Sequence, residues 1–277
     1  MMNLEPTAAF VLHYSKGIYK NNLIKKYLEY IDFSSANSII AMCEEKKISH
    51  LLHEAMCSRK FIITRLVLNA LEENNYEQIV IFASGKSPIS LELLLNNKNH
   101  IAIFELDNAS FSEKRNIFKK LLDKNNFNKL NFLETDITDL KLIHKLEDYN
   151  FDKKKRTILI FEGITHYIDK KLYFKLLQNF SNNSKNKFII EYAPEIAKLS
   201  EDYKFAVKEV FNFIEKNYYS AKMTNYSKNE FIDFFKSISG EINKIYDLRM
   251  ISSMRKSEKY KFENNFVGPL EVIDANA

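Results

Sequence analysis

Short apolar runs alternate with segments of helical periodicity through the middle of the chain. The runs are rich in β-branched and aromatic side chains and are too short for helices, which is typical of strands buried on both faces of a sheet. They span residues 78–82, 101–106, 131–134, 157–161 and 187–192. This alternation predicts stacked βαβ units and therefore a parallel sheet with helices on both faces.

The two ends of the chain have different patterns. Apolar residues recur at helical spacing through residues 1–75, which predicts helices before the first strand. Residues 194–217 predict a long helical insertion, and residues 228–237 predict another helix. Two further segments, Lys244–Ile251 and Lys259–Phe266, are expected to close the sheet as an antiparallel edge pair. The prediction is an α/β fold with a doubly wound, seven-stranded, mostly parallel sheet.

We expect a single domain over residues 1–277, because the sequence shows neither an internal repeat nor a linker rich in Gly, Pro or Ser. A helical N-terminal extension, which would also serve as a lid, is expected at 1–75. The ligand-binding core would follow at 76–193, a helical insertion at 194–240 and the closing strands at 241–277.

Composition narrows the class of protein. The net charge of +5 comes with lysines spread over the whole chain, so nucleic acid is not the expected partner. No signal peptide and no apolar stretch of about 18 residues is visible, so we expect a cytoplasmic protein without a membrane anchor. Cys43 and Cys57 form no CxxC pair, and His50 and His53 have no evident third ligand, so no metal site is expected.

The carboxyl ends of the predicted strands carry the candidate ligand-binding residues, since ligands of open parallel sheets bind beyond these ends. The first strand runs into the turn at 83–85, and Asp107, Asp136 and Glu162 follow the next three strands. Each feature alone fits a turn, a helix cap or a solvated carboxylate. Their joint order along successive strands favours a ligand site.

The spacing indicates the kind of ligand. Gly85 precedes Asp107 by 22 residues, the spacing at which a close turn and a ribose-binding carboxylate receive a nucleoside. The phosphate-cradling G-x-G-x-x-G motif is absent, and Lys86, Ser87 and Pro88 stand where a pyrophosphate needs small residues. S-adenosylmethionine, a nucleoside cofactor without phosphates, fits better.

Three segments resemble the leucine carboxyl methyltransferase family. The segment FELD at 104–107, followed by EKR at 113–115, is similar to the family's aromatic-Glu-x-Asp…Lys-Arg signature. LIFEGITHYI at 159–168 is similar to its apolar-Glu-Gly-x-x-x-Tyr-apolar segment, and SRKF at 58–61, with Arg65 beyond, to its Arg-bearing helix. The resemblance implies a class I methyltransferase fold, a lid inserted after the fifth strand, and methyl transfer to carboxylates of proteins or small molecules. It also admits relatives that act on tRNA bases or natural products.

The resemblance also implies roles for individual residues. Asp107 would hold the ribose of S-adenosylmethionine, and Asp136 and Ile137 would flank the adenine. Glu162 would meet the ammonium of the methionine end, and Arg59 would meet its carboxylate.

The first turn departs from the family pattern Gly-x-Gly-x-Asp-Thr. Here the turn reads ASGKSP at 83–88, so Ala83 replaces the first Gly and Ser87 replaces the Asp, while Gly85 is retained. Ala83 and Gly85 are still expected to contact the cofactor. Lys86 would either fold away from the cofactor pocket or block it.

The methyl acceptor has its own candidate residues. An ionised carboxylate needs no base, so catalysis would rest on alignment in a site without water. An arginine could fix the carboxylate by two hydrogen bonds; Arg65 is the candidate and Arg59 the rival. Tyr167 and Tyr192 would line the acceptor pocket, and His166 could act as base for a hydroxyl acceptor.

Three functions follow. The first is a methyltransferase acting on a carboxylate of a small molecule, of natural-product type. The second is a binding or assembly protein on a degenerate methyltransferase fold, suggested by the altered first turn. The third is an RNA-modifying methyltransferase, suggested by the charge. The sequence also leaves a homodimer open.

Overall fold

The computed structural model describes residues 1–73, 76–96, 101–181, 185–219, 222–255 and 266–277. An N-terminal helical region precedes the sheet; it consists of β1 (Met2–Asn3), α1 (Pro6–Ser15), η1 (Lys16–Ile18), α2 (Asn22–Leu28), β2 (Ile31–Asp32), η2 (Ser34–Ala36), α3 (Asn37–Glu45) and α4 (Ser49–Glu73). Strands and helices then alternate as β3 (Gln78–Phe82), α5 (Ile89–Asn96), β4 (Ala102–Asp107), α6 (Ser112–Leu121), α7 (Lys124–Phe127), β5 (Leu130–Glu134), α8 (Leu142–Glu147), β6 (Thr157–Phe161), η3 (Thr165–Tyr167), α9 (Lys170–Asn179) and β7 (Lys187–Tyr192). The chain ends with η4 (Ile196–Lys198), α10 (Glu201–Asn217), α11 (Lys228–Ser237), β8 (Glu241–Asp247), α12 (Leu248–Met254) and β9 (Glu271–Asn276).

The sheet confirms the predicted architecture. Its seven strands lie in the order β5-β4-β3-β6-β7-β9-β8, and all neighbours from β5 to β7 pair in parallel. β9 runs antiparallel to both β7 and β8. β3 and β6 are neighbours near the centre of the sheet. From β3 the chain adds strands toward one edge, and from β6 it adds strands toward the other edge. This switch point is where an open α/β sheet forms its ligand crevice.

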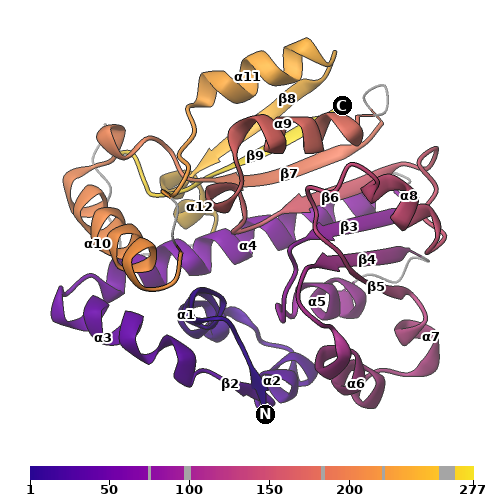
Figure 1. The fold of residues 1–277 in the computed structure, drawn as a ribbon, viewed down its shortest axis with the longest axis horizontal. Coiled ribbons are helices and arrows are strands. Elements are labelled where there is room, and N and C mark those ends of the chain that lie inside the picture. The colour runs from indigo at the N-terminus through magenta and orange to yellow at the C-terminus, as the bar shows by residue number, and fades with distance from the viewer. Residues whose placement is uncertain (74–75, 97–100, 182–184, 220–221, 256–265) are drawn as a thin grey trace.

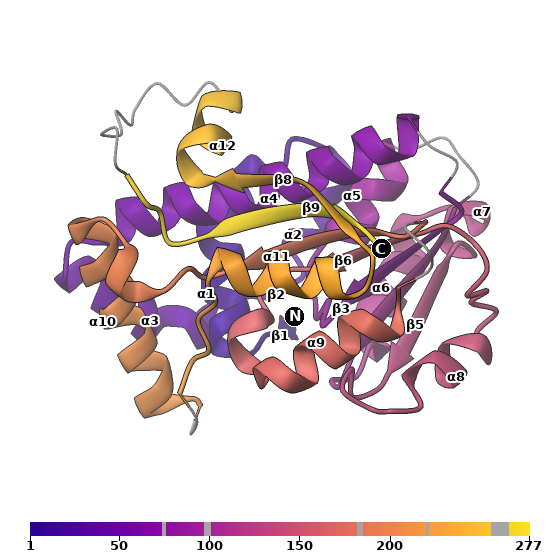
Figure 2. The ribbon, with the colours of Figure 1, turned by 90° about the horizontal axis from the view of Figure 1, so that it is seen from above.

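Side chains of the central strands alternate between two hydrophobic cores. In β3, Ile79 and Ile81 pack with the N-terminal helices, whereas Val80 and Phe82 pack with α8, α9 and α11. Figure 2 shows the resulting layers, with α4 and α5 on one face of the sheet and α8, α9 and α11 on the other. Because both faces are covered, the strands are apolar throughout, as their sequences predict.

The N-terminal region and the insertion meet at one end of the sheet. Figure 1 shows α1, α3 and α10 beyond the ends of the parallel strands, with α4 running along the sheet. Helices dominate the N-terminal region as predicted, but Ile31, expected to continue a helix, pairs with Met2 in the short parallel strands β1 and β2. Strands of two residues are too short to leave a periodic pattern.

The predicted closing strands were partly wrong. The segment Lys244–Ile251 is strand only to Asp247, because the Asp247 side chain accepts a hydrogen bond of 2.7 Å from the Met250 amide and caps α12. Of the segment Lys259–Phe266, residues 259–265 lie outside the described residues, and Phe266 is not in a strand. The last strand is β9, at the end of the chain.

Candidate active site

Two hollows lie beyond the carboxyl ends of the strands and meet at Ala83 and Tyr167. The larger has about 1020 Å³ of empty space, open solvent included, between the ends of β3 and β6, α1, α4 and α10. The smaller has about 730 Å³, open solvent included, at the ends of β4 and β5, and its lining includes Asp107, Asp136 and Ile137. The two hollows adjoin each other at the switch point of the sheet.

The turn after β3 keeps a glycine-like conformation despite its altered sequence. Gly85 has φ +49°, and Ala83 has φ 47°, a left-handed conformation that costs a residue with a Cβ about 1–2 kcal/mol. The Gly85 amide donates a hydrogen bond of 2.7 Å to Asp107 Oδ2, and the Ser84 amide donates one of 2.9 Å to the Leu106 carbonyl. These bonds fix the turn against the end of β4, so alanine at position 83 leaves the turn intact.

A buried ion pair is hydrogen-bonded to this turn and holds it in place. Glu105 and Lys114 are fully buried and paired with each other, and the hydroxyls of Ser84 and Ser90 donate to Glu105. Lys114 Nζ also donates to the Gly85 carbonyl at 3.0 Å. Burial lowers the pKa of Lys114, and Glu105 opposes that effect. The Glu and Lys of the sequence signature therefore hold the turn and do not line either hollow.

Lys86 lines the larger hollow, and its ammonium is held by residues of other elements. The ammonium donates to the Asn3 carbonyl at 2.8 Å and pairs with Glu113 at 2.6 Å. The Tyr27 hydroxyl donates to the Lys86 carbonyl at 2.8 Å. The lysine thus joins the turn to the N-terminal region.

Asp107 retains acceptor capacity toward the smaller hollow. Its Oδ2 accepts from Gly85, and its Oδ1 accepts from the Ala109 amide at 2.9 Å. Each carboxylate oxygen has two lone pairs, so each can accept a further hydrogen bond. Asp136 is exposed, and its Oδ1 accepts from the amide and hydroxyl of Thr138, which is the local turn that its sequence also allowed.

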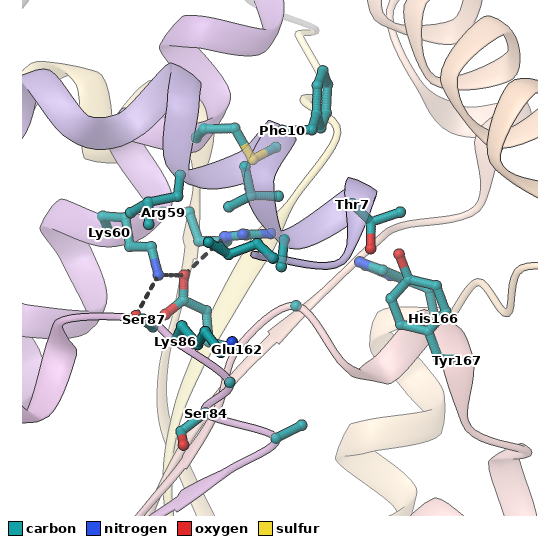
Figure 3. A pocket seen from close by; sticks show the side chains of 18 of the residues that line it. Thr7, Phe10, Arg59, Lys60, Ser84, Lys86, Ser87, Glu162, His166 and Tyr167 are labelled. Atoms are coloured by element: carbon teal, nitrogen blue, oxygen red, sulfur yellow. Dashed lines mark hydrogen bonds and ion pairs between the residues drawn. The ribbon is translucent and has the colours of Figure 1, made fainter. Parts of the chain in front are cut away.

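The larger hollow has a buried charged cluster at the end of β6 (Figure 3). Glu162 Oε1 lies 2.7 Å from Lys60 Nζ and 3.1 Å from Arg59 Nε. Lys60 also donates to the Ser87 hydroxyl at 3.2 Å. Burial acts to raise the pKa of Glu162, but the charges of Lys60 and Arg59 together hold it below its ordinary value. Burial lowers the pKa of Lys60, against the effect of Glu162.

Two polar atoms of this cluster are left without a proper hydrogen bond. Arg59 Nε and Glu162 Oε1 are close enough to pair, but they are among the described buried atoms that lack a hydrogen bond of good geometry. The ion pairs of Glu162 with Lys60 and Arg59 offset only part of the cost of burying these charged groups. Arg59 and Glu162 both line the hollow, so a ligand with a carboxylate and an ammonium would satisfy them.

Glu191, which the sequence analysis missed, stands behind the cluster. Its Oε2 accepts a hydrogen bond of 2.8 Å from the Gly163 amide and lies 3.7 Å from Arg59 Nη1. The sequence pattern had favoured its neighbour Tyr192, but adjacent strand residues point to opposite faces. Tyr192 is fully buried against Phe231 on the other face, and its hydroxyl donates to Glu271. Tyr192 therefore does not line the acceptor pocket.

Arg65 is also separated from the hollow. It lies six positions after Arg59 on α4, a rotation of about 240° around the helix. Its side chain is exposed and its guanidinium stands over the Phe61 ring at 5.7 Å. The structure thus corrects the choice between the two arginines: Arg59 lines the hollow together with Lys60, and Arg65 does not.

His166 and Tyr167 form the opposite wall of the larger hollow (Figure 3). His166 is 8% exposed, and its ring lies 5.7 Å from the ring of Phe211. Burial lowers the pKa of His166; Glu191 opposes this effect and Arg59 reinforces it. Burial raises the pKa of Tyr167. At neutral pH the wall therefore offers a neutral imidazole and a protonated phenol.

S-adenosylmethionine fits the residues that line the two hollows. The ribose hydroxyls need acceptors, which Asp107 would supply, and the amino acid end needs an anion and a cation, which Glu162 and Arg59 would supply. The unsatisfied atoms of Arg59 and Glu162 provide the structural observation behind this fit. Among the described residues, no group of His, Cys, Asp and Glu side chains could hold a metal ion.

Solved structures of other proteins share this fold. A protein from Thermobifida fusca assigned as a methyltransferase has a TM-score of 0.65 at 12% identity, covering 98% of this chain and 94% of its own. A DUF574 family protein from Streptomyces avermitilis has a TM-score of 0.63 at 13% identity, covering 97% of this chain and 96% of its own. A protein from Nostoc punctiforme assigned as an O-methyltransferase has a TM-score of 0.52 at 11% identity, covering 83% and 60%. These similarities show the class I methyltransferase fold.

The sequence comparison shows the family. No curated protein matches the chain. The family model described as leucine carboxyl methyltransferase, however, matches residues 20–181, which is more than half of the 277 residues. Within the described residues, no helix is long and apolar enough to cross a membrane. The chain therefore belongs to the leucine carboxyl methyltransferase family and is an S-adenosylmethionine-dependent methyltransferase.

Proposed function

We propose that the protein transfers a methyl group to a carboxylate of a small, largely apolar molecule of natural-product type. The observation that carries this proposal is the lining of the larger hollow. At one end it has the buried pair of Arg59 and Glu162, and toward α1 and α10 it is walled by apolar side chains: Leu4, Phe10, Val11, Val210, Phe211 and Ile214. Such a hollow suits a molecule with one polar reacting group and an apolar body.

In this proposal the cofactor spans both hollows. Asp107 binds the ribose, Asp136 and Ile137 flank the adenine, and Arg59 and Glu162 bind the amino acid end. Ala83 lines both hollows, and Gly85 lines the larger one. When bound, S-adenosylmethionine supplies a methyl group on a positively charged sulfur.

The residues of the chain then have to align the acceptor and exclude water. A carboxylate is already ionised, so no base is required, and the gain comes from orientation in a dry site. The cluster is close to neutral, because Arg59 and Lys60 face Glu162 and Glu191. An acceptor carboxylate is therefore balanced by the sulfonium. Tyr167, which burial keeps protonated, donates a hydrogen bond that positions the acceptor.

The lid is part of the same proposal. Both the N-terminal helix α1 and the insertion helix α10 contribute lining residues, which supports a roof that closes over the acceptor. Deleting residues 1–40 would not test it, because Tyr19 and Tyr27 of that segment are buried in the core. Substitutions of single lining residues are the sharper test.

One observation favours a second candidate, methylation of a hydroxyl group. His166 lines the hollow and is buried, and its lowered pKa keeps it neutral. A neutral imidazole could accept the hydroxyl proton as the acceptor attacks, and later release it to water.

Matched pairs of acids and alcohols with the same carbon skeleton separate the two candidates. We would measure formation of S-adenosylhomocysteine and of methylated product, for example with 3-phenylpropanoate and 3-phenylpropanol, and with longer alkyl homologues. The carboxylate proposal predicts a base-labile methyl ester that still forms in His166→Asn. A base-stable ether that is lost in His166→Asn would support the hydroxyl candidate instead. Cofactor binding without turnover on any acceptor would favour a binding protein, and methylated RNA would favour the third function.

A further inference from the structure

Glu191 joins three parts of the active site, although its own side chain does not line either hollow. We propose that Glu191 is a positioning residue, whose carboxylate holds the turn at Gly163, the Arg59 guanidinium and the His166 ring in one arrangement and neutralises the cluster for a cationic cofactor. This inference rests on the proposed placement of the amino acid end of the cofactor at Arg59 and Glu162.

The first two contacts share one oxygen. Glu191 Oε2 accepts from the Gly163 amide at 2.8 Å and lies 3.7 Å from Arg59 Nη1. Gly163 has φ +68°, and a Cβ there would come within 3.5 Å of Arg59 Nη2. The guanidinium therefore lies directly against the Gly163 backbone, and Glu191 holds the two together. Since Gly163 follows Glu162 directly, this contact also fixes where the Glu162 carboxylate points.

The third contact faces the opposite wall. Glu191 Oε1 lies 4.0 Å from His166 Nε2, close enough for electrostatic attraction but too long for a hydrogen bond. The other groups that face His166 are Arg59, which repels its protonated form, the hydroxyl of Thr165 at 3.5 Å, and the rings of Tyr167 and Phe211. Of the described charged groups that act on the ring, Glu191 favours its protonation and Arg59 opposes it.

The charge of Glu191 matters as much as its shape. Without it, the two cations Arg59 and Lys60 would keep one direct ion-pair partner, Glu162, with Glu92 acting on Lys60 from beyond ion-pair distance, and the cluster would be more positive by one charge. S-adenosylmethionine itself carries a net positive charge from its sulfonium. Charges a few ångströms apart in a buried site interact strongly, so a positive cluster would repel this cofactor. Glu191 removes the repulsion while leaving Glu162 available to the ammonium.

The test compares two isosteric substitutions on neighbouring strands. Glu191→Gln keeps the shape and removes the charge. Asp274→Asn is the matched control: Asp274 lies on β9 opposite Ile189, is largely buried, and pairs with Lys187 of β7 at 2.6 Å. Both variants lose an ion pair of the same strand, but only Glu191 reaches the site. Thermal unfolding would establish that each variant is folded.

Two measurements test the positioning role of Glu191: the affinity for the cofactor and the titration of His166. In calorimetry with S-adenosylmethionine, Glu191→Gln should bind about tenfold or more weakly than the wild type, while Asp274→Asn binds like the wild type. In an NMR titration of the histidines without cofactor, with His166 assigned by His166→Asn, Glu191→Gln should lower the pKa of His166 and Asp274→Asn should leave it unchanged. Wild-type affinity and an unaltered His166 titration in Glu191→Gln would overturn the inference.

Failure of the proposed function has a different signature. If the wild type binds no S-adenosylmethionine, the proposed cofactor site is wrong and the cofactor role of Glu191 is wrong with it, while the His166 titration still decides whether Glu191 holds the histidine. If Glu191→Gln does not fold, Glu191→Asp serves in its place. That variant keeps the charge but shortens the reach, so it should bind the cofactor more weakly than the wild type; unchanged affinity in Glu191→Asp would overturn the positioning role.

Discussion

The two hollows at the ends of the strands are built in opposite ways. In the smaller, the acidic residue Asp107 is half-buried and is held by backbone amides of Gly85 and Ala109. In the larger, the acidic residue Glu162 is buried and is held by the side chains of Arg59 and Lys60. The Asp107 carboxylate is thus fixed by the backbone of the turns that follow β3 and β4. The Glu162 carboxylate is fixed by side chains of helix α4, which precedes the sheet in the sequence.

Because of this difference, a ligand would be bound in different ways at the two ends of the crevice. Asp107 can accept ligand hydrogen bonds without breaking any that it already makes. Glu162 and Arg59 are paired with each other, so a ligand has to share or replace that pairing. Substitutions should therefore affect the smaller hollow mainly through ligand binding, and the larger hollow through ligand binding and stability together.

The largest expected effect is that of Arg59→Ala. Removing the guanidinium leaves Glu162 and Glu191 buried with reduced compensation, and breaking a buried ion pair in this way costs about 3–5 kcal/mol of unfolding free energy. Cofactor binding should be lost as well. Denaturant unfolding and calorimetry with S-adenosylhomocysteine would measure the two effects.

Arg65→Ala is the control on the same helix. Arg65 is exposed, so its removal should change the unfolding free energy by no more than about 0.5 kcal/mol and leave cofactor affinity unchanged. Loss of turnover in Arg65→Ala with normal activity in Arg59→Ala would reverse the assignment of the two arginines.

Asp107→Ala should have an intermediate effect, mainly on ligand binding. The loss of its acceptors should weaken cofactor binding by about 1–3 kcal/mol, because the ribose hydroxyls and the Gly85 amide lose their partner. Calorimetry with S-adenosylhomocysteine would measure this loss. Unchanged affinity in a folded variant would remove Asp107 from the site.

Phe211→Ala should affect the acceptor and spare the cofactor. Phe211 lines the larger hollow from α10, and the loss of its apolar contact should raise KM for an apolar acceptor by roughly tenfold. Steady-state kinetics with the acceptor found among the acid and alcohol pairs would show it. Phe205→Ala on the same helix is the control, because Phe205 is 47% exposed and does not line the hollow. Equal effects of the two substitutions would contradict a roof formed by α10.

The smallest effect concerns pH. Burial lowers the pKa of His166 below 6.5, so the unfolded chain binds this proton at a higher pH than the folded chain does. The free energy of unfolding should therefore decrease as pH falls from about 6.5 toward the folded pKa, and be insensitive to this group above 6.5. Thermal unfolding at stepped pH should show a weaker decrease in His166→Asn. His144→Asn, at a residue 79% exposed, should follow the wild type; a wild-type slope in His166→Asn would refute the assignment.

The smaller hollow was easier to predict from the sequence than the larger. Residues at the ends of consecutive parallel strands must share one edge of the sheet, so the spacing of Gly85 and Asp107 was enough to bring them together, and they are hydrogen-bonded. The five short apolar runs in the sequence likewise predicted strands β3 to β7 of the sheet. The roles of the individual cofactor residues stay predictions.

The residues that surround the larger hollow depend on which face of the sheet or of α4 each side chain occupies. The pattern of apolar and polar residues does not predict that face here. The segment KFIIEY is buried on both faces, so it does not show whether Glu191 or Tyr192 points to the site. The choice between Arg59 and Arg65 likewise depends on rotation around α4. The capping role of Asp247 also went unnoticed, because apolar residues stand on both sides of it and the segment 244–251 therefore resembles a single strand.

The proposal that the two hollows form one cofactor site is tested most directly by a crystal structure of the complex with S-adenosylhomocysteine. We expect the ribose on Asp107, the adenine beside Ile137, and the amino acid end between Arg59 and Glu162. A ligand that lies wholly within one hollow, or outside both, would contradict it.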